Sequence, residues 1–171
     1  MTERTLVLLR HAKSDWPAGV PDVERPLADR GRSDAPVAGD LLARLVGSFD
    51  LALVSPATRT QQTWMLVGER VSADEVVLEP AIYDASVHDL LTLVRAIPDS
   101  SDTTLLIGHN PGIADLTLLL AGDGDAHARE RIAQKFPTCG VAVLHVTGGW
   151  TEIAPGSATL AGFHIPRAGS A

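Results

Sequence analysis

Residues 6–11 read Leu6-Val7-Leu8-Leu9-Arg10-His11, four consecutive aliphatic side chains followed by a cation and an imidazole. A short aliphatic run that breaks into polar residues predicts a buried strand that leads into a loop. Open α/β sheets bind ligands outside the carboxyl ends of their strands, so Arg10 and His11 would lie where a ligand is expected. On this pair alone, a surface ion pair beside a solvated histidine is the more common arrangement.

A second apolar run, residues 103–107, also leads into a histidine, His109. Pro111 fits the first turn of a following helix, because its missing N–H costs nothing there. Asn110 would then cap this helix. The free N–H groups at the start of the helix favour an anion close to His109. An ordinary strand–turn–helix connection with a structural histidine is the alternative.

A third apolar run, residues 51–54, is followed by Ser55, Pro56 and then Arg59. Ser55 as the N-cap and Pro56 at the first helical position predict a helix that begins here. Arg59 would lie in its first turns, near the same edge of the sheet. Cations usually avoid a helix N-terminus, where the dipole is already positive, so an anion that neutralises Arg59 would explain its position. A simple exposed helix arginine is the alternative.

Together these segments resemble the histidine phosphatase superfamily, and in particular its SixA-like phosphohistidine phosphatase branch. The segment 25–32 is also similar to the family's loop before its first long helix, so the resemblance covers roughly residues 5 to 150. Ala12 stands where many members have glycine, a departure that the SixA-like branch shares. The resemblance is carried by three runs, Leu9-Arg10-His11-Ala12-Lys13-Ser14, Ser55-Pro56-Ala57-Thr58-Arg59-Thr60-Gln61-Gln62-Thr63 and Gly108-His109-Asn110-Pro111-Gly112.

The resemblance implies an α/β fold, a single three-layer α/β/α domain with a mostly parallel sheet, similar to phosphoglycerate mutase. It implies that His11 is the nucleophile and that His109 is the second histidine of the pocket. Arg10 and Arg59 match the two phosphate-binding arginines, and Asn110 is expected to contact the phosphate with them.

The residue types suit phosphoryl transfer. A phosphoryl group in flight spreads negative charge over three oxygens, and arginine forks make bidentate contacts to such oxygens. His109 would add a third cation if protonated, and His11 must present one neutral nitrogen to phosphorus. We therefore expect a phosphohistidine intermediate that water hydrolyses, with no metal and no other cofactor, since the cations supply the charge that metal ions supply elsewhere.

The group that protonates the leaving group is harder to assign. The phosphatase and mutase branches of the superfamily carry an acidic residue after the second arginine, and residues 78–85 contain only Glu79 and Asp84. Asp84 is the candidate, with a turn or helix cap as the alternative. The SixA-like branch is thought to lack a strong acid, and a phosphoramidate bond breaks more readily than an ester.

Composition agrees with a soluble enzyme domain. With 171 residues, of which 45% are hydrophobic, it is expected to form one domain over residues 1–171. A net charge of −7 argues against a nucleic-acid surface. There is no apolar run of roughly 18 residues and no secretory signal, so a cytoplasmic protein without membrane contact is expected. Cys139, the single cysteine, excludes an intramolecular disulfide.

Alternation of strand and helix patterns predicts the sheet with helices on both faces. Gly148 and Gly149 would form the turn of a final antiparallel hairpin. Residues 122–138 are expected to be a mobile insertion, and residues 155–171 an irregular tail. His127 is expected to be exposed, with a lid over the pocket as the alternative. Strands are expected at residues 5–10, 51–54, 75–78, 104–107, 141–146 and 150–153. Helices are expected at 31–46, 57–69, 87–96 and 112–121.

The expected substrate is phosphohistidine on a protein or a small phosphomonoester. Two alternatives are a phosphotransferase similar to phosphoglycerate mutase and a regulator that binds phosphate without turnover. The other histidines, His88, His145 and His164, are expected to be structural or solvated. Several residues near the expected pocket mouth are equally suited to substrate contact or to solvent, namely Lys13, Ser14, Arg25, Arg30 and Arg32.

Overall fold

The aliphatic run at the start of the chain forms β1 (Glu3–Arg10) in the computed structural model, which describes residues 2–169. Successive side chains of a strand point to opposite faces of the sheet. Leu6 and Leu8 accordingly enter one hydrophobic cluster, and Val7 and Leu9 enter a second. All four are completely buried. The run is unbroken because helices cover both faces of the sheet, so that neither face accepts a polar side chain.

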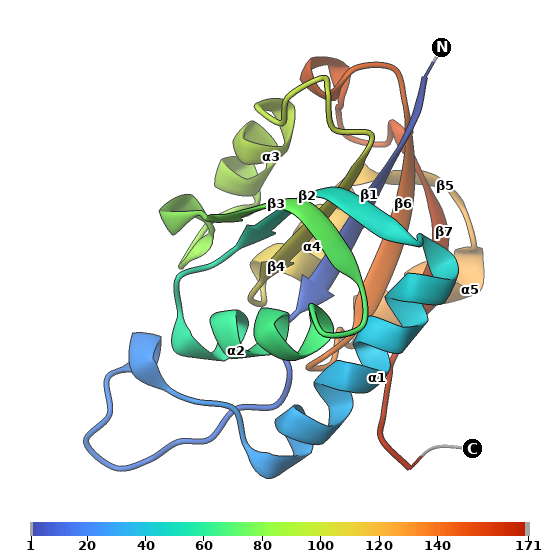
Figure 1. Cartoon of the computed structure of the whole chain (residues 1–171). Coiled ribbons are helices and arrows are strands. Elements are labelled where there is room, and N and C mark those ends of the chain that lie inside the picture. The colour runs from blue at the N-terminus through green and yellow to red at the C-terminus, as the bar shows by residue number, and fades with distance from the viewer. Residues whose placement is uncertain (1, 170–171) are drawn as a thin grey trace.

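β1 lies inside a seven-stranded sheet of order β3-β2-β4-β1-β6-β7-β5 (Figure 1). β3, β2, β4 and β1 are parallel to one another, and β5 is parallel to β7. β6 is antiparallel to both of its neighbours, so it alone runs against the others. The mostly parallel sheet expected from the sequence is confirmed. The remaining strands are β2 (Ser48–Val54), β3 (Ser72–Leu78), β4 (Thr103–Gly108), β5 (Ala121–Gly124), β6 (Val141–Thr147) and β7 (Ala158–His164).

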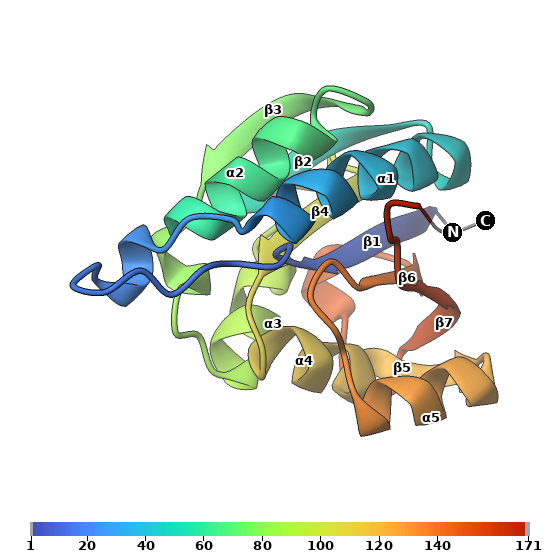
Figure 2. The same cartoon turned by 90° about the horizontal axis from the view of Figure 1, so that it is seen from below.

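Five α-helices cover the sheet and make the expected three layers. α1 (Asp29–Leu45) and α2 (Thr58–Val67) lie on one face (Figure 2). α3 (Val87–Arg95), α4 (Gly112–Leu120) and α5 (Ala126–Gln134) lie on the other. The bounds of the first four helices agree with the sequence prediction within two residues at each end.

The two helix caps expected from the sequence are wrong. α2 begins at Thr58 after the N-cap residue Ala57, so Ser55 lies outside the helix and is completely buried at the end of β2. α4 begins at Gly112 after the N-cap residue Pro111. In both places the polar side chain bonds to a distant segment, Ser55 to His109 and Asn110 to Phe136. These tertiary contacts compete with the local capping bonds that the sequence predicts.

The C-terminal part of the chain differs most from the sequence prediction. Residues 150–153 form no strand but a 3-10 helix, η3 (Trp150–Glu152), so Gly148 and Gly149 are not a hairpin turn. The antiparallel partner of β6 is β7, which lies in the segment expected to be an irregular tail. β7 reads Ala-Thr-Leu-Ala-Gly-Phe-His, which has few strong strand formers. Its position is determined by pairing with β6 and by burial of Leu160 and Phe163.

Residues 122–138 are also ordered, against the expectation of a mobile insertion. β5 joins the edge of the sheet by pairing with β7, and Asp125 caps α5 by accepting a hydrogen bond from the Ala128 N–H at 3.0 Å. Ala128, Ile132 and Phe136 are buried in the core. His127 is exposed on α5, as expected, and it is not among the described residues that line the pocket at the carboxyl ends of the strands. Within the described residues, no helix is long and apolar enough to cross a membrane.

Candidate active site

The carboxyl ends of three adjacent parallel strands, β2, β4 and β1, bring the polar motifs together. Arg10 of β1 is in register with Gly108 of β4, and Val54 of β2 is in register with Ile107 of β4. The residues that follow continue this pairing. The His11 N–H donates to the Gly108 carbonyl and the Ser55 N–H donates to the Ile107 carbonyl, each at 3.1 Å. Sheet register therefore sets His11, Ser55 and His109 side by side.

A pocket of about 310 Å³ opens at this edge. The imidazole centroids of His11 and His109 lie 5.4 Å apart across it. Arg10 and Arg59, predicted from separate segments, both line it, as does Asn110. The structure thus brings the two arginines, the two histidines and Asn110 into one pocket. The complete lining is Arg10, His11, Lys13, Ser14, Trp16, Arg25, Arg59, His109, Asn110 and Thr138.

The tautomer of His11 follows from one hydrogen bond. Its Nδ1 lies 2.7 Å from the carbonyl oxygen of Ala12, and a carbonyl can only accept, so Nδ1 carries the proton. Nε2 of the neutral ring is then an unprotonated nitrogen with a free lone pair. Burial, with smaller contributions from His109 and the two arginines, lowers the pKa of His11 to about 3. The imidazole is therefore neutral at physiological pH.

His109 is held by Ser55, whose Oγ lies 2.7 Å from Nε2 of the ring. The Ala57 N–H donates to the same oxygen at 3.4 Å. We assign the Ser55 hydroxyl as the donor to Nε2, which places the ring proton of His109 on Nδ1. Burial, followed by the charge of Arg59, lowers the pKa of His109 to about 4. His109 is thus neutral in the unliganded pocket, and it adds a third cation only if a bound anion raises its pKa.

The carbonyl of Phe136, in the segment after α5, organises one wall of the pocket. It accepts a hydrogen bond from Arg10 Nη1 at 3.0 Å and another from Asn110 Nδ2 at 2.8 Å. This contact explains why Asn110 does not cap α4. Burial and the charge of Arg59 lower the pKa of Arg10, which shows how crowded the pocket is with positive charge.

Asp22, which the sequence analysis missed, is the counter-charge of this pocket. Its carboxylate accepts hydrogen bonds from Arg59 Nη2 at 3.2 Å and from Arg25 Nη1 at 3.0 Å. The Tyr83 hydroxyl donates to the same carboxylate at 2.5 Å. These bonds, with the Tyr83 bond the largest contributor, hold the pKa of Asp22 far below its usual range. An acidic residue three positions before Arg25 is the signal that could have revealed it.

Two buried guanidinium N–H groups and one buried imidazole nitrogen at the pocket have no hydrogen-bond partner within residues 2–169. They are Arg10 Nε, Arg59 Nε and His109 Nδ1. A buried donor without a partner costs about 1–3 kcal/mol, and more when the group is charged. A tetrahedral oxyanion offers several acceptors and compensates two guanidinium charges. The residue types and the free donors therefore fit a phosphate-like anion.

The other residues that the sequence singled out lie partly in this pocket and partly outside it. Asp84 is exposed and lines an adjoining cavity of about 290 Å³, which shares Arg59, His109 and Asn110 with the main pocket. Glu79 accepts a hydrogen bond from the Ala81 N–H at 3.1 Å and so caps η2 (Pro80–Ile82). Lys13, Ser14 and Arg25 do line the pocket. Arg30 and Arg32 do not, because they bond to Thr138 and to Leu27 and Asp29 respectively.

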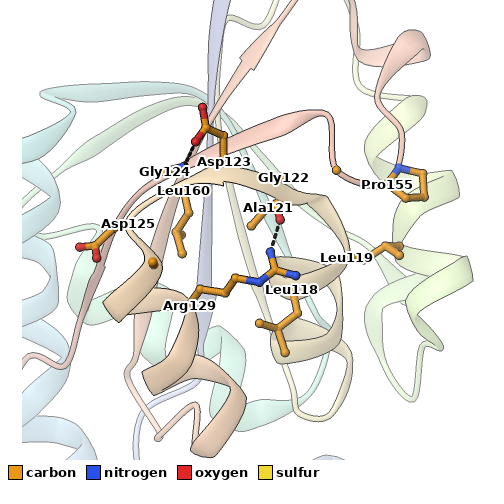
Figure 3. A pocket seen from close by; sticks show the side chains of 12 residues that line it. Leu118, Leu119, Ala121, Gly122, Asp123, Gly124, Asp125, Arg129, Pro155 and Leu160 are labelled. Carbon is orange, nitrogen blue, oxygen red and sulfur yellow. Dashed lines mark hydrogen bonds between the residues drawn. The ribbon is translucent and has the colours of Figure 1, made fainter.

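A larger cavity, of about 580 Å³, lies between the end of α4, β5 and α5 (Figure 3). Its charged side chains already have local partners. Asp123 accepts from the Gly124 N–H, and Arg129 donates to the Ala121 carbonyl. Asp125 caps α5. None of the described residues that line it is a histidine, cysteine or serine, so the smaller pocket is the better candidate for catalysis. Over residues 2–169, no group of three or more His, Cys, Asp or Glu is placed to hold a metal ion.

Both the sequence and the fold of this chain match known proteins. Residues 6–93 match the family model of the histidine phosphatase superfamily (branch 1). An uncharacterized protein of Mycobacterium tuberculosis is 40% identical over 161 residues, which cover 93% of this chain and 100% of that protein. The structure of a provisionally assigned phosphohistidine phosphatase, SixA, from Nakamurella multipartitia superposes with a TM-score of 0.86. It is 30% identical, and the match covers 97% of this chain and 98% of that one.

Phosphoglycerate mutase from Plasmodium falciparum superposes with a TM-score of 0.63 at 17% identity, covering 100% of this chain and 99% of that one. At this identity the likeness concerns the fold alone, and it confirms the expected architecture.

Proposed function

This chain belongs to the histidine phosphatase superfamily, and from that premise we propose that it is a metal-independent phosphatase acting through a phosphohistidine intermediate on His11. Its substrate is phosphohistidine or a small phosphomonoester. The observation that carries the proposal is the Nδ1 proton of His11, shared with the Ala12 carbonyl at 2.7 Å, which leaves Nε2 as a neutral nucleophile in a pocket of free cationic donors.

In the first step the Nε2 lone pair of His11 attacks phosphorus. The bond from phosphorus to the leaving atom breaks, and its electron pair departs with the leaving group, which takes a proton from solvent. Arg10 and Arg59 stabilise the charge on the equatorial oxygens, and the Nδ1–H of His109 donates to one of them. The Ala12 carbonyl stabilises the positive charge that develops on His11, since it accepts from Nδ1 throughout.

In the second step water hydrolyses the phosphorylated His11. The water oxygen attacks phosphorus, the P–Nε2 electron pair returns to His11, and a water proton passes to solvent. Inorganic phosphate leaves and the enzyme returns to its starting state. Arginine charges serve both steps, so the proposal needs no metal ion as a Lewis acid.

The absence of a carboxylate among the described residues that line the pocket supports a preference for P–N over P–O substrates. Asp22 is bound to Arg59, Arg25 and Tyr83 and its pKa is lowered, so it is a poor proton donor. Imidazole is a better leaving group than an alkoxide and depends less on a general acid. Asp84, in the adjoining cavity, stays a candidate acid for ester substrates.

The test is phosphate release from a phosphohistidine-bearing protein and from an aryl phosphate, measured in EDTA. We expect the wild type to act on both and to favour the phosphohistidine substrate. His11→Ala should reduce release by about 10³-fold or more, as loss of a nucleophile does elsewhere. His88→Ala, at an exposed histidine of α3, is the matched control.

The outcomes separate the alternatives. Activity that requires an added metal would contradict the mechanism, and equal activity of the wild type and His11→Ala would contradict the nucleophile. Phosphate binding without release from either substrate would favour a binding protein. Dependence on a bisphosphorylated cofactor would favour a phosphotransferase.

A further inference from the structure

Trp16 stands at the rim of the pocket with most of its indole in solvent. Its exposed fraction is 77%, the largest of any large hydrophobic side chain among the described residues. It is also the one large apolar side chain among the described residues that line the pocket. Every other lining side chain that could meet a substrate beyond its phosphoryl group is charged or polar. Trp16 is therefore the pocket's apolar surface.

The backbone that carries Trp16 is fixed. Ser14 forms an antiparallel bridge with Leu27, and the Asp15 N–H donates to the Pro26 carbonyl at 2.9 Å. The Asp15 carbonyl in turn accepts from Arg25 Nε at 2.9 Å. The residue immediately before Trp16 is thus bonded through both of its backbone polar groups, so the indole starts from a defined position.

The indole ring is fixed as well, because it stacks on Arg25. The guanidinium carbon of Arg25 lies 3.3 Å from the centroid of the ring. Arg25 itself is 7% exposed, and its remaining bonds go to Ser14 Oγ at 2.7 Å and to Asp22 Oδ1 at 3.0 Å. Donors of a guanidinium lie in its plane, so these bonds hold the plane while one flat face meets the indole. The outer face of the indole is left free.

Resting on the proposed function, we propose that the outer face of the Trp16 indole is the leaving-group subsite. It selects a flat aromatic leaving group, such as imidazole, over ammonia or an aliphatic alcohol. A phosphoryl group bound by Arg10, Arg59 and His109 directs its leaving group away from His11, because attack is in line. A planar ring that reaches the rim stacks on the indole and buries apolar area that would otherwise face water.

Two substrates with the same reacting bond test this subsite. Phosphoimidazole and phosphoramidate both break a P–N bond, but only the first releases a ring. We expect Trp16→Leu to lower kcat/KM for phosphoimidazole roughly three- to tenfold, the range of an aromatic pair, and to change phosphoramidate by less than about twofold. Trp16→Phe should retain most of the activity on phosphoimidazole. kcat/KM is the right quantity because hydrolysis of the shared intermediate is independent of the leaving group.

Val20→Ala is the matched control, since Val20 is 37% exposed on the same loop and does not line the pocket. It should change neither substrate. An equal loss on both substrates in Trp16→Leu would overturn the subsite and indicate a structural role. Unchanged kcat/KM for phosphoimidazole would overturn it too. If the wild type releases phosphate from neither compound, the subsite is overturned, whereas the proposed function is decided separately by release from the phosphohistidine-bearing protein.

Discussion

Two neutral imidazoles lie beside the guanidinium groups of Arg10 and Arg59 in this pocket, and the charge of each group affects the protonation of the others. The pKa of His11 is lowered to about 3 and that of His109 to about 4, in both cases chiefly by burial. A neutral His11 is what a nitrogen nucleophile requires. An anion between the arginines would oppose their field and raise the pKa of His109, so that substrate binding itself favours a proton on that residue.

We predict that the protein loses stability as the pH falls from about 6.5 towards 4. The unfolded histidines bind protons from about pH 6.5 downwards, whereas folded His11 and His109 do so only near pH 3 and 4. The unfolded state therefore binds more protons in this window. Each histidine then removes up to about 1.4 kcal/mol of stability per pH unit. Urea unfolding of the wild type, His11→Asn and His109→Gln at several pH values measures this.

Each of these variants should show a shallower loss than the wild type. His127→Gln, at an exposed histidine on α5, serves as the control. Identical slopes in all four proteins would contradict the buried neutral histidines.

At the scale of elements, the site depends on how closely α1 approaches the loop after β1. Gly31 lies in the first turn of α1 against the backbone of Lys13, and a Cβ there would overlap the Lys13 carbonyl oxygen. The Ala28 N–H donates to the same carbonyl at 2.9 Å. Lys13 is two residues from His11, so this contact holds the pocket loop against the helix.

We predict that Gly31→Ala destabilises the protein and weakens catalysis, although alanine is intrinsically the better helix former by about 1 kcal/mol. The new methyl group must push the loop away from α1, because its neighbour is backbone and cannot rotate aside. We expect a loss of about 1–3 kcal/mol, as for other overpacked sites. Thermal unfolding and kcat/KM measure the two effects. Ser33→Ala, at an exposed position of the same helix, should be neutral, and a stabilised Gly31→Ala would refute the contact.

At the scale of the whole molecule, a small cationic pocket is set in an acidic body. The chain has a net charge of −7, yet Arg10, Lys13, Arg25 and Arg59 all line one pocket. Close to the pocket the local cations dominate, while at longer range the negative charge of the body does. The short-range and the long-range electrostatic interactions respond differently to salt, because screening weakens the distant ones first.

We predict that the charge of the peptide around a phosphohistidine affects kcat/KM most strongly at low salt. A lysine-rich carrier peptide should be preferred several-fold over a glutamate-rich one at about 0.01 M ionic strength, where the Debye length is about 30 Å. The preference should largely disappear near 0.1 M, where that length is about 10 Å. Steady-state kcat/KM on both peptides measures it. Preference for the glutamate-rich peptide at low salt would mean that the cationic rim outweighs the acidic body.

The local hydrophobic pattern of the sequence was sufficient to predict the central strands of the sheet and the helices between them. Unbroken aliphatic runs such as residues 6–9 can be stable only as strands buried on both faces, and the helices alternate with them along the chain. Parallel strands end at one edge of the sheet, so Arg10, His11 and His109 were expected at the same edge. The sequence by itself therefore determined the layers, the first four helices and the edge at which these residues lie.

Only the tertiary structure decided the features that depend on partners far away in the chain. β5 and β7 both contain glycine and alanine. β7 becomes a strand by pairing with β6 on one side and β5 on the other, and β5 by pairing with β7. Ser55 and Asn110 leave their expected caps for His109 and Phe136, and Asp22 becomes the counter-charge of Arg59. Such contacts join residues 26 to 54 positions apart. Their strength depends on burial and on geometry that exists only in the folded chain, so no local preference records them.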